Sequence, residues 1–208
     1  MQAAPTGQPS QGRSTRRLVV GLGLAVLIGG VAFVATRPLG AAPSAPGASF
    51  YPIGPSVEGL AIGESAPDFV AASGGQKPLL TDLDGKPIRL ADFAGRPLWI
   101  VFWTTWCTPC QQEASHIRAA YHAHRADDLA VLAVDLQEPA AAVREYIVSH
   151  QLDYDIGLDP AAAVKDLYGA WGLPSHFFID RNGVIRDRYF GQMTRELMEE
   201  RLRAIIGS

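Results

Sequence analysis

The segment FWTTWCTPCQQE, Phe102–Glu113, contains both cysteines of the 208-residue chain, Cys107 and Cys110. A disulfide between residues three positions apart stabilises a fold little, because the entropy that a bridge removes from the unfolded chain decreases with loop length. At the start of a helix, however, unpaired N–H groups and the helix dipole favour the reactive thiolate. The pattern therefore predicts redox chemistry, with Cys107 as an exposed nucleophile and Cys110, directed inward, as the thiol that resolves a mixed disulfide.

The residues around the cysteine pair fit this chemistry. Pro109 suits a first helical turn, where its missing N–H costs no hydrogen bond. Glu113 follows Cys110 by one turn, on or beside the face predicted to be buried, where a raised pKa would let it exchange a proton with the resolving thiol. The alternative is that Glu113 borders solvent and only favours the first turns of the helix electrostatically. Trp106 adjoins the nucleophile and is a candidate to shield it or to contact substrate. The other nearby aromatic residues are predicted to be core: Trp99, Phe102 and Trp103.

Metal and haem binding do not suit the motif. A zinc site would combine the two cysteines with two histidines of the following helix, which requires poor helix geometry. The candidate histidines are His116, His122 and His124. Gln111 follows C-T-P-C where a haem attachment site has histidine. We therefore expect no metal, and no cofactor other than a redox-active Cys107–Cys110 disulfide.

The hydrophobic pattern of residues 57–208 switches repeatedly between the strand period and the helix period. It predicts strands at 97–103, 129–135 and 154–159, helices at Thr108 to about Arg125, 139–150, 160–170 and 194–206, and hairpins at Asp84-Gly85 and Asn182-Gly183. Strands that alternate with helices indicate an α/β fold with a mostly parallel sheet, here with an antiparallel edge. A C-x-x-C where a strand passes into a helix is typical of a redox motif.

An uncharged apolar run of 19 residues, 18–36, precedes this domain and is long enough to cross a bilayer. Three arginines lie just before the run, so we expect a single-pass anchor with a cytoplasmic N-terminus. The alternative is a signal peptide cleaved near Gly40-Ala41-Ala42. Residues 1–17 then form a disordered cytoplasmic tail, and 37–56 a linker rich in Pro, Ala and Gly. Both alternatives place the domain outside the cytoplasm. An anchor would keep it at the cell membrane, on the extracytoplasmic or periplasmic side, and cleavage of a signal peptide would make it a secreted protein.

Charge is distributed unevenly along the chain. Residues 1–56 contain four arginines and no acidic residue, which leaves 14 basic and 21 acidic residues, a net charge near −7, for 57–208. A moderately acidic domain without a basic stripe argues against nucleic-acid binding.

The segment FWTTWCTPC resembles the active-site stretch of thioredoxin-like proteins, above all of the membrane-anchored thiol–disulfide oxidoreductases of the ResA, TlpA and CcmG/DsbE kind. The resemblance covers about residues 61–206 and includes GESAPDF, DLDGKPIRLADFAGRPLWIVFW and GLPSHFFIDRNGVI. It implies a thioredoxin-like α/β fold, with a central mixed sheet flanked by helices, an added N-terminal β-hairpin, and one transmembrane helix before the domain.

The resemblance also implies roles for single residues. In this family a proline late in the domain is cis and its loop packs against the disulfide, which implies these roles for Pro174 and its neighbours Leu173 and Ser175. The family's acidic residue after the second cysteine corresponds to Glu113. The chain has Val101 where the thioredoxins proper keep a buried aspartate, and Glu113 is expected to substitute for it. Many relatives have threonine in place of Ser175, and both hydroxyls can hydrogen-bond a substrate backbone.

The residues between the cysteines favour one direction of electron flow. A proline before the second cysteine resembles thioredoxin, at about −270 mV, more than DsbA, at about −120 mV. The resemblance therefore implies an extracytoplasmic reductant of protein disulfides. Its substrates would be apocytochrome c or misoxidised secreted proteins, and its electrons would come from a membrane thiol donor of the CcdA/DsbD kind.

Three other functions remain open at this point. An oxidant that donates disulfides would use the same residues at a higher potential. A peroxiredoxin-type peroxidase would use the T-x-x-C of Thr104 and Cys107, but Ile100 stands where that motif has a proline. A redox-inert binding module would require both thiols to be unreactive.

Overall fold

The computed structural model describes residues 51–52, 60–70 and 78–207, all within one compact unit, Ala48–Ser208. The predicted tail, the apolar run 18–36 and all of the linker except Tyr51–Pro52 lie outside these residues. Within the described part of the chain, no helix is long and apolar enough to cross a membrane.

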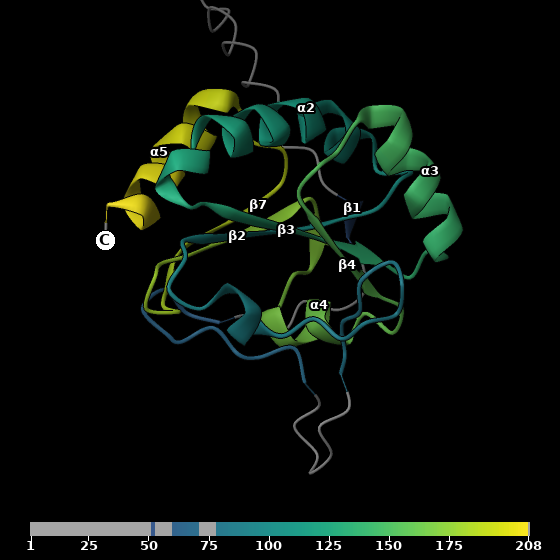
Figure 1. Ribbon diagram of the computed structural model, residues 1–208, viewed down its shortest axis with the longest axis horizontal. Helices are drawn as coiled ribbons and strands as arrows, with labels where there is room; N and C mark the ends of the chain where they lie inside the picture. Colours follow the sequence, from purple (N-terminus) through teal and green to yellow (C-terminus); the bar gives the residue numbers. More distant parts are fainter. Residues whose placement is uncertain (1–50, 53–59, 71–77, 208) are drawn as a thin grey trace, which may run out of the picture. The chain divides into compact units, whose positions relative to one another are not determined.

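A five-stranded sheet forms the centre of the fold, in the order β4-β3-β2-β6-β7 (Figure 1). Its strands are β2 (Leu98–Trp103), β3 (Ala130–Leu136), β4 (Asp155–Asp159), β6 (Ser175–Ile179) and β7 (Ile185–Phe190). β2, β3 and β4 are parallel, while β6 and β7 run antiparallel to β2 and to each other. The predicted mixed sheet is therefore confirmed. Every residue of β2 and β3 is buried, as expected for central strands covered on both faces.

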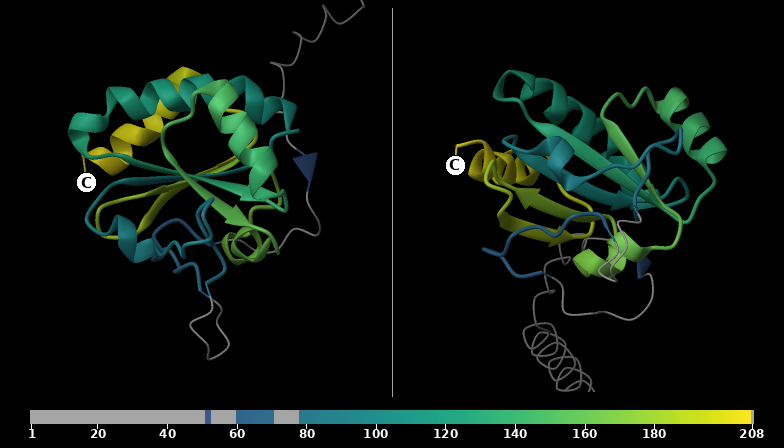
Figure 2. Two further views of the ribbon diagram at one scale, coloured as in Figure 1. Left: turned by 45° about the vertical axis from the view of Figure 1, so that its right-hand side comes forward. Right: turned by 60° about the horizontal axis from the view of Figure 1, so that its bottom comes forward.

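Helices cover both faces of this sheet (Figures 1 and 2). On one face lie α2 (Thr108–Ala123), α3 (Ala140–His150) and α5 (Arg195–Ile206), and on the other lie α4 (Ala163–Tyr168) and the short 3-10 helix η1 (Leu90–Phe93). A second 3-10 helix, η2 (Arg125–Asp127), follows α2. All four predicted helices are present, but α4 is shorter than the predicted 160–170 because Ala162, with a φ of 55°, interrupts its start.

The N-terminal β-hairpin predicted at Asp84-Gly85 is wrong in its extent. Gly85 takes a φ of 82° in a tight turn, but only a single bridge, between Thr81 and Pro87, closes it. On its other side Thr81 pairs with the edge strand β4, where it exchanges two backbone hydrogen bonds with Leu158 at 2.7 and 3.3 Å. The segment is therefore a turn attached to the main sheet.

A second, two-stranded sheet lies outside the central one. Its strands are β1 (Tyr51–Pro52), from the end of the linker, and β5 (Gly172–Leu173), and they are antiparallel. β5 leads directly into Pro174, so the described part of the linker pairs with the segment that precedes this proline.

Asp159 holds the start of α4 in place. Its fully buried carboxylate accepts the backbone N–H groups of Ala163, Val164 and Lys165 at 2.8, 2.9 and 2.9 Å. Asp159→Ala would leave three donors without an acceptor, so we expect a loss of about 2–3 kcal/mol in the free energy of unfolding. Urea denaturation measures the loss. Asp159→Asn, which keeps one acceptor oxygen, should lose less, and equal losses for the two variants would contradict the capping role.

Candidate active site

The two cysteines lie where β2 passes into α2, as predicted. Cys107 is the N-cap of α2 and forms a disulfide with Cys110. The Sγ atom of Cys107 also accepts the backbone N–H of Cys110 at 3.3 Å. Pro109 lies in the first turn of the helix, the position expected for it. The amino end of α2 is therefore directed at the sulfur of Cys107, the arrangement that favours a thiolate when the disulfide is reduced.

The predicted exposure of Cys107 is wrong for this disulfide form. Cys107 is 0% exposed and Cys110 is 4% exposed. The Sγ of Cys107 is bonded to that of Cys110 and accepts the Cys110 N–H. Trp106 is 56% exposed and Thr108 is exposed as well, so the residues on either side of Cys107 form the surface here. Trp106 thus differs from the other three aromatic residues of the segment, which are core as predicted: Trp99, Phe102 and Trp103.

The loop before β6 lies at the same end of the sheet as the cysteines. Its Leu173–Pro174 peptide bond is cis, as the resemblance implies. Ser175 pairs with Phe102 near the carboxyl end of β2, from which the chain continues to Cys107. The buried Ser175 hydroxyl donates to the carbonyl oxygen of Gly172 at 2.5 Å. This hydroxyl, expected to contact a substrate backbone, is therefore used within the loop.

Glu113 is fully buried, which confirms the first of the two interpretations of its position. Its Oε2 accepts the backbone N–H of Met193, just before α5, at 3.0 Å. Burial raises the pKa of Glu113 well above its ordinary value, and the hydrogen bond from Met193 offsets part of that rise. Glu113 is therefore a carboxyl group that can hold a proton at pH values where an exposed glutamate has lost it.

Glu113 and Cys110 line the same small cavity, of about 10 Å³, between α2 and the sheet. Val101, at the position of the thioredoxin aspartate, lines it too. A cavity of this size is at the lower limit for a single water molecule. Glu113 thus reaches, from the helix, the space beside Val101 and Cys110, at the position of the thioredoxin aspartate.

A buried histidine, which sequence reasoning missed, touches Glu113. His176 of β6 is fully buried, and its Nε2 lies 3.4 Å from Oε1 of Glu113 and 3.2 Å from the carbonyl oxygen of Gly191. Burial lowers the pKa of His176 to about 3, so the ring is neutral. The signal was a histidine inside SHFFID, a segment predicted to be a buried strand.

Two further carboxyl groups at this end of the sheet were also missed. Glu138 accepts both the backbone N–H and the hydroxyl of Thr105, each at 2.6 Å, and so holds the loop that leads to Cys107. Asp135, at the end of β3, is fully buried, and burial together with Glu138 raises its pKa to about 9. Because parallel strands end at the same edge of a sheet, both residues could have been placed here from the predicted strand 129–135.

Comparisons with known proteins agree with this site. Residues 62–188 match the model of the AhpC/TSA family. The chain is 32% identical over 148 residues to the thiol–disulfide oxidoreductase ResA of Bacillus thuringiensis subsp. konkukian, a match that covers 71% of this chain and 80% of that one. ResA of Geobacillus thermodenitrificans is 34% identical over 146 residues, or 70% and 79% of the two chains. The chain belongs to the AhpC/TSA family.

Within the AhpC/TSA family, the chain is a thiol–disulfide oxidoreductase of the thioredoxin-like fold. A crystal structure described as thiol:disulfide interchange protein DsbE from Chlorobium tepidum superposes with a TM-score of 0.63 at 27% identity, over 71% of this chain and 99% of that chain. The redox-active pair of this family member is the Cys107–Cys110 disulfide.

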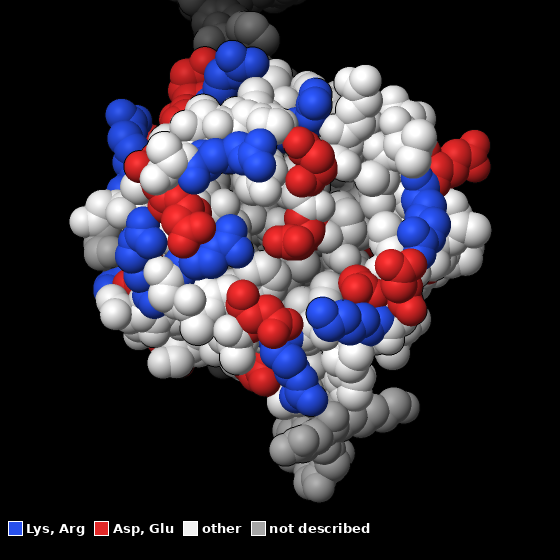
Figure 3. All heavy atoms as spheres, in the orientation of Figure 1, with Lys and Arg blue, Asp and Glu red and all other residues white. Residues whose placement is uncertain are grey.

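Two of the three histidines considered as zinc ligands, His122 of α2 and its C-cap His124, pair with carboxyl groups. His122 pairs with Asp153, and His124 with Asp127 and Glu199. Among the described residues, no group of three His, Cys, Asp or Glu side chains could hold a metal ion. On the face shown in Figure 3, basic and acidic side chains are interspersed, without a large patch of one sign.

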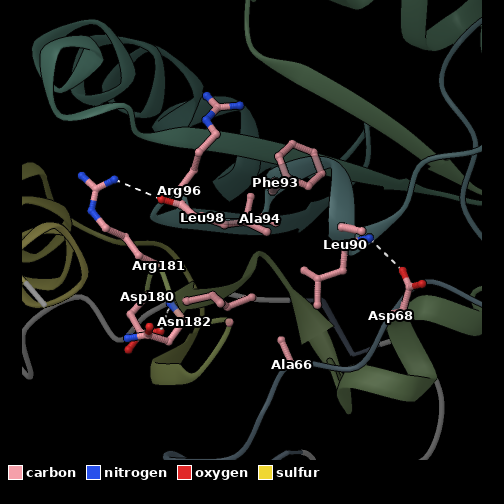
Figure 4. A pocket seen from close by; sticks show the side chains of 14 residues that line it. Ala66, Asp68, Leu90, Phe93, Ala94, Arg96, Leu98, Asp180, Arg181 and Asn182 are labelled. Atoms are coloured by element: carbon pink, nitrogen blue, oxygen red, sulfur yellow. Dashed lines mark hydrogen bonds between the residues drawn. The ribbon is translucent and has the colours of Figure 1, made fainter.

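A larger hollow, of about 380 Å³, lies at the opposite end of β2, beside Leu98 and Ile179 (Figure 4). Its polar groups already have partners in the surrounding loops. Arg181 donates to the carbonyl oxygens of Gly95 and Asp127, and Asp68 accepts the N–H of Leu90. The redox-active pair therefore lies at the other end of β2 from this hollow.

Proposed function

We propose that the chain is an extracytoplasmic reductant of protein disulfides, with Cys107 as the nucleophile and Cys110 as the resolving thiol. The Cys107 thiolate attacks one sulfur of a substrate disulfide, whose S–S bond breaks as the mixed disulfide forms. Cys110 then attacks the Sγ of Cys107 and releases the second substrate thiol. Two electrons and two protons pass to the substrate, and the Cys107–Cys110 disulfide remains. The observation that carries this order is the position of Cys107 as the N-cap of α2, with its Sγ facing the Cys110 N–H.

The residues around the disulfide support the reducing direction. Pro109 precedes Cys110, as in thioredoxin, and no histidine lies between the cysteines to stabilise the thiolate further. A less stabilised thiolate gives a more reducing pair. The apolar run 18–36 would hold the domain at the outer side of the membrane, near a thiol electron donor of the CcdA/DsbD kind. Oxidised C-x-x-C-H segments of apocytochrome c are the substrates that this proposal favours. Trp106, exposed beside Cys107, is the candidate side chain to contact them.

The equilibrium of the Cys107–Cys110 pair with reduced and oxidised dithiothreitol tests the direction. We expect a midpoint potential near the thioredoxin end of the scale, about −270 mV. The disulfide of an oxidised C-x-x-C-H peptide should then be reduced to two thiols when the peptide is mixed with the reduced protein, while Cys107 and Cys110 form their disulfide. A peptide with serines in place of both cysteines is the control. A potential near about −120 mV would make the protein a disulfide donor and overturn the reducing direction.

A further inference from the structure

His176 lies on the face of β6 that is directed at α2. In the antiparallel ladder between β2 and β6 its register partner is Val101. Side chains of directly opposed residues in such a ladder lie about 5 Å apart and on the same face of the sheet. Val101 in turn lines the cavity that Cys110 and Glu113 share. The buried polar groups beside this cavity therefore come from two elements, the carboxyl group of α2 and the imidazole of β6.

The contacts of the ring define which atom carries the proton. Nε2 of His176 lies 3.2 Å from the carbonyl oxygen of Gly191, which can only accept a hydrogen bond. Nε2 is thus the protonated nitrogen of the neutral ring, and the same N–H is 3.4 Å from Oε1 of Glu113. The other oxygen, Oε2, accepts the N–H of Met193. Oε2 therefore has a hydrogen bond, whereas Oε1 has no hydrogen-bond partner and lies beside the imidazole ring.

We propose that His176 is a positioning residue for thiol–disulfide exchange: its imidazole, with Nε2 3.4 Å from the otherwise unpartnered Oε1 of Glu113, keeps that carboxyl group beside the Cys110 cavity and favours its ionised form. The ionised Glu113 accepts the proton of the Cys110 thiol, the resulting thiolate attacks the Sγ of Cys107, and the released substrate thiolate takes a proton from solvent. The inference deepens the proposed function, since it requires Cys110 to be the resolving thiol.

Few other titratable groups face this pair. Cys110 and Tyr154 share the cavity with Glu113. The ring of His176 packs against the rings of Trp99 on β2 and Tyr189 on β7, with centroid-to-centroid distances of 5.9 and 6.3 Å. The nearby charged residues of α5 pair elsewhere, Glu199 with His124 and Arg201 with Asp187. Burial keeps His176 neutral, and it raises the pKa of Tyr154 so far that the phenol stays protonated at any pH where the protein would act. Glu113 and Cys110 are therefore the groups that exchange protons here.

The titration of the Glu113 carboxyl group tests this role in the oxidised protein, followed by carbon-13 NMR with Glu113→Gln to assign the signal. His176→Leu removes the N–H donor, and we expect the pKa of Glu113 to rise by about one unit, a tenfold change in the ratio of charged to neutral carboxyl. His176→Gln can place an amide N–H near the position of Nε2 and should restore most of the wild-type value. His176→Asn, whose amide is too short to reach, should behave like His176→Leu and serves if the leucine variant does not fold.

The pH dependence of substrate disulfide reduction gives the second measurement. In His176→Leu the pH–rate profile should shift to higher pH by as much as the pKa of Glu113 rises. In a Glu113→Gln background, adding His176→Leu should not shift the profile. An unchanged Glu113 titration in both the Leu and Asn variants would overturn the positioning role. If the titration shifts but the rate profile of Glu113→Gln equals that of the wild type, the positioning of Glu113 stands and its proposed role in proton transfer fails.

Discussion

Cys107→Ser is expected to reduce the rate of substrate disulfide reduction to that without enzyme. The serine hydroxyl does not form a disulfide, and the chain has no cysteine other than Cys110, which lies within the first turn of α2. The measurement is the reduction of a peptide disulfide by protein that has first been reduced with dithiothreitol and then freed of it.

Cys110→Ala is the matched variant, because it removes the second thiol and leaves the nucleophile in place. We expect it to accumulate a mixed disulfide between Cys107 and the substrate, visible by mass spectrometry and cleaved by dithiothreitol. Cys107→Ser should accumulate none. If the two variants exchanged these results, the assignment of nucleophile and resolving thiol would be reversed. Because Cys107 is completely buried in the disulfide form, this is the first test to perform.

Local patterns in the sequence were sufficient to predict most of the fold. The run of apolar residues at 97–103 and the helical period after Cys107 gave β2 and α2 within two residues of their observed ends. The turn at Asn182-Gly183, where Gly183 has a φ of 77°, gave the antiparallel edge formed by β6 and β7. Each of these features depends on neighbours a few positions away, so a single sequence contains the information.

The parts of the site that the sequence did not predict depend on distant residues. The hydrogen bond from Met193 to Glu113 joins positions 80 apart, and those from Thr105 to Glu138 join positions 33 apart. Helical periodicity placed Glu113 on the buried side of α2, but it carries no information on which strand lies opposite, so His176 was missed. The burial of Cys107 was not predicted either, because the position of a residue in the motif does not show what packs over it.

Glu113→Gln should slow disulfide reduction by about 10²-fold, the usual contribution of a single general acid–base group. Glutamine has nearly the same shape and its amide oxygen can still accept the Met193 N–H, so the fold should persist, but it cannot take the proton of Cys110. Single-turnover measurements with the pre-reduced protein should locate the loss in the step that resolves the mixed disulfide. A loss confined to formation of the mixed disulfide would contradict the assignment.

The same substitution should change how stability depends on pH. Burial raises the folded-state pKa of Glu113, so between its ordinary pKa and the raised value the native state holds a proton that the unfolded chain has lost. The free energy of unfolding of the wild type therefore falls as pH rises through this window, and Glu113→Gln lacks that contribution. Urea denaturation across the window should show the variant gaining stability relative to the wild type as pH increases. Glu145→Gln, on the exposed side of α3, is the control and should remain parallel to the wild type. Parallel curves for Glu113→Gln as well would contradict the raised pKa of Glu113 in the folded protein.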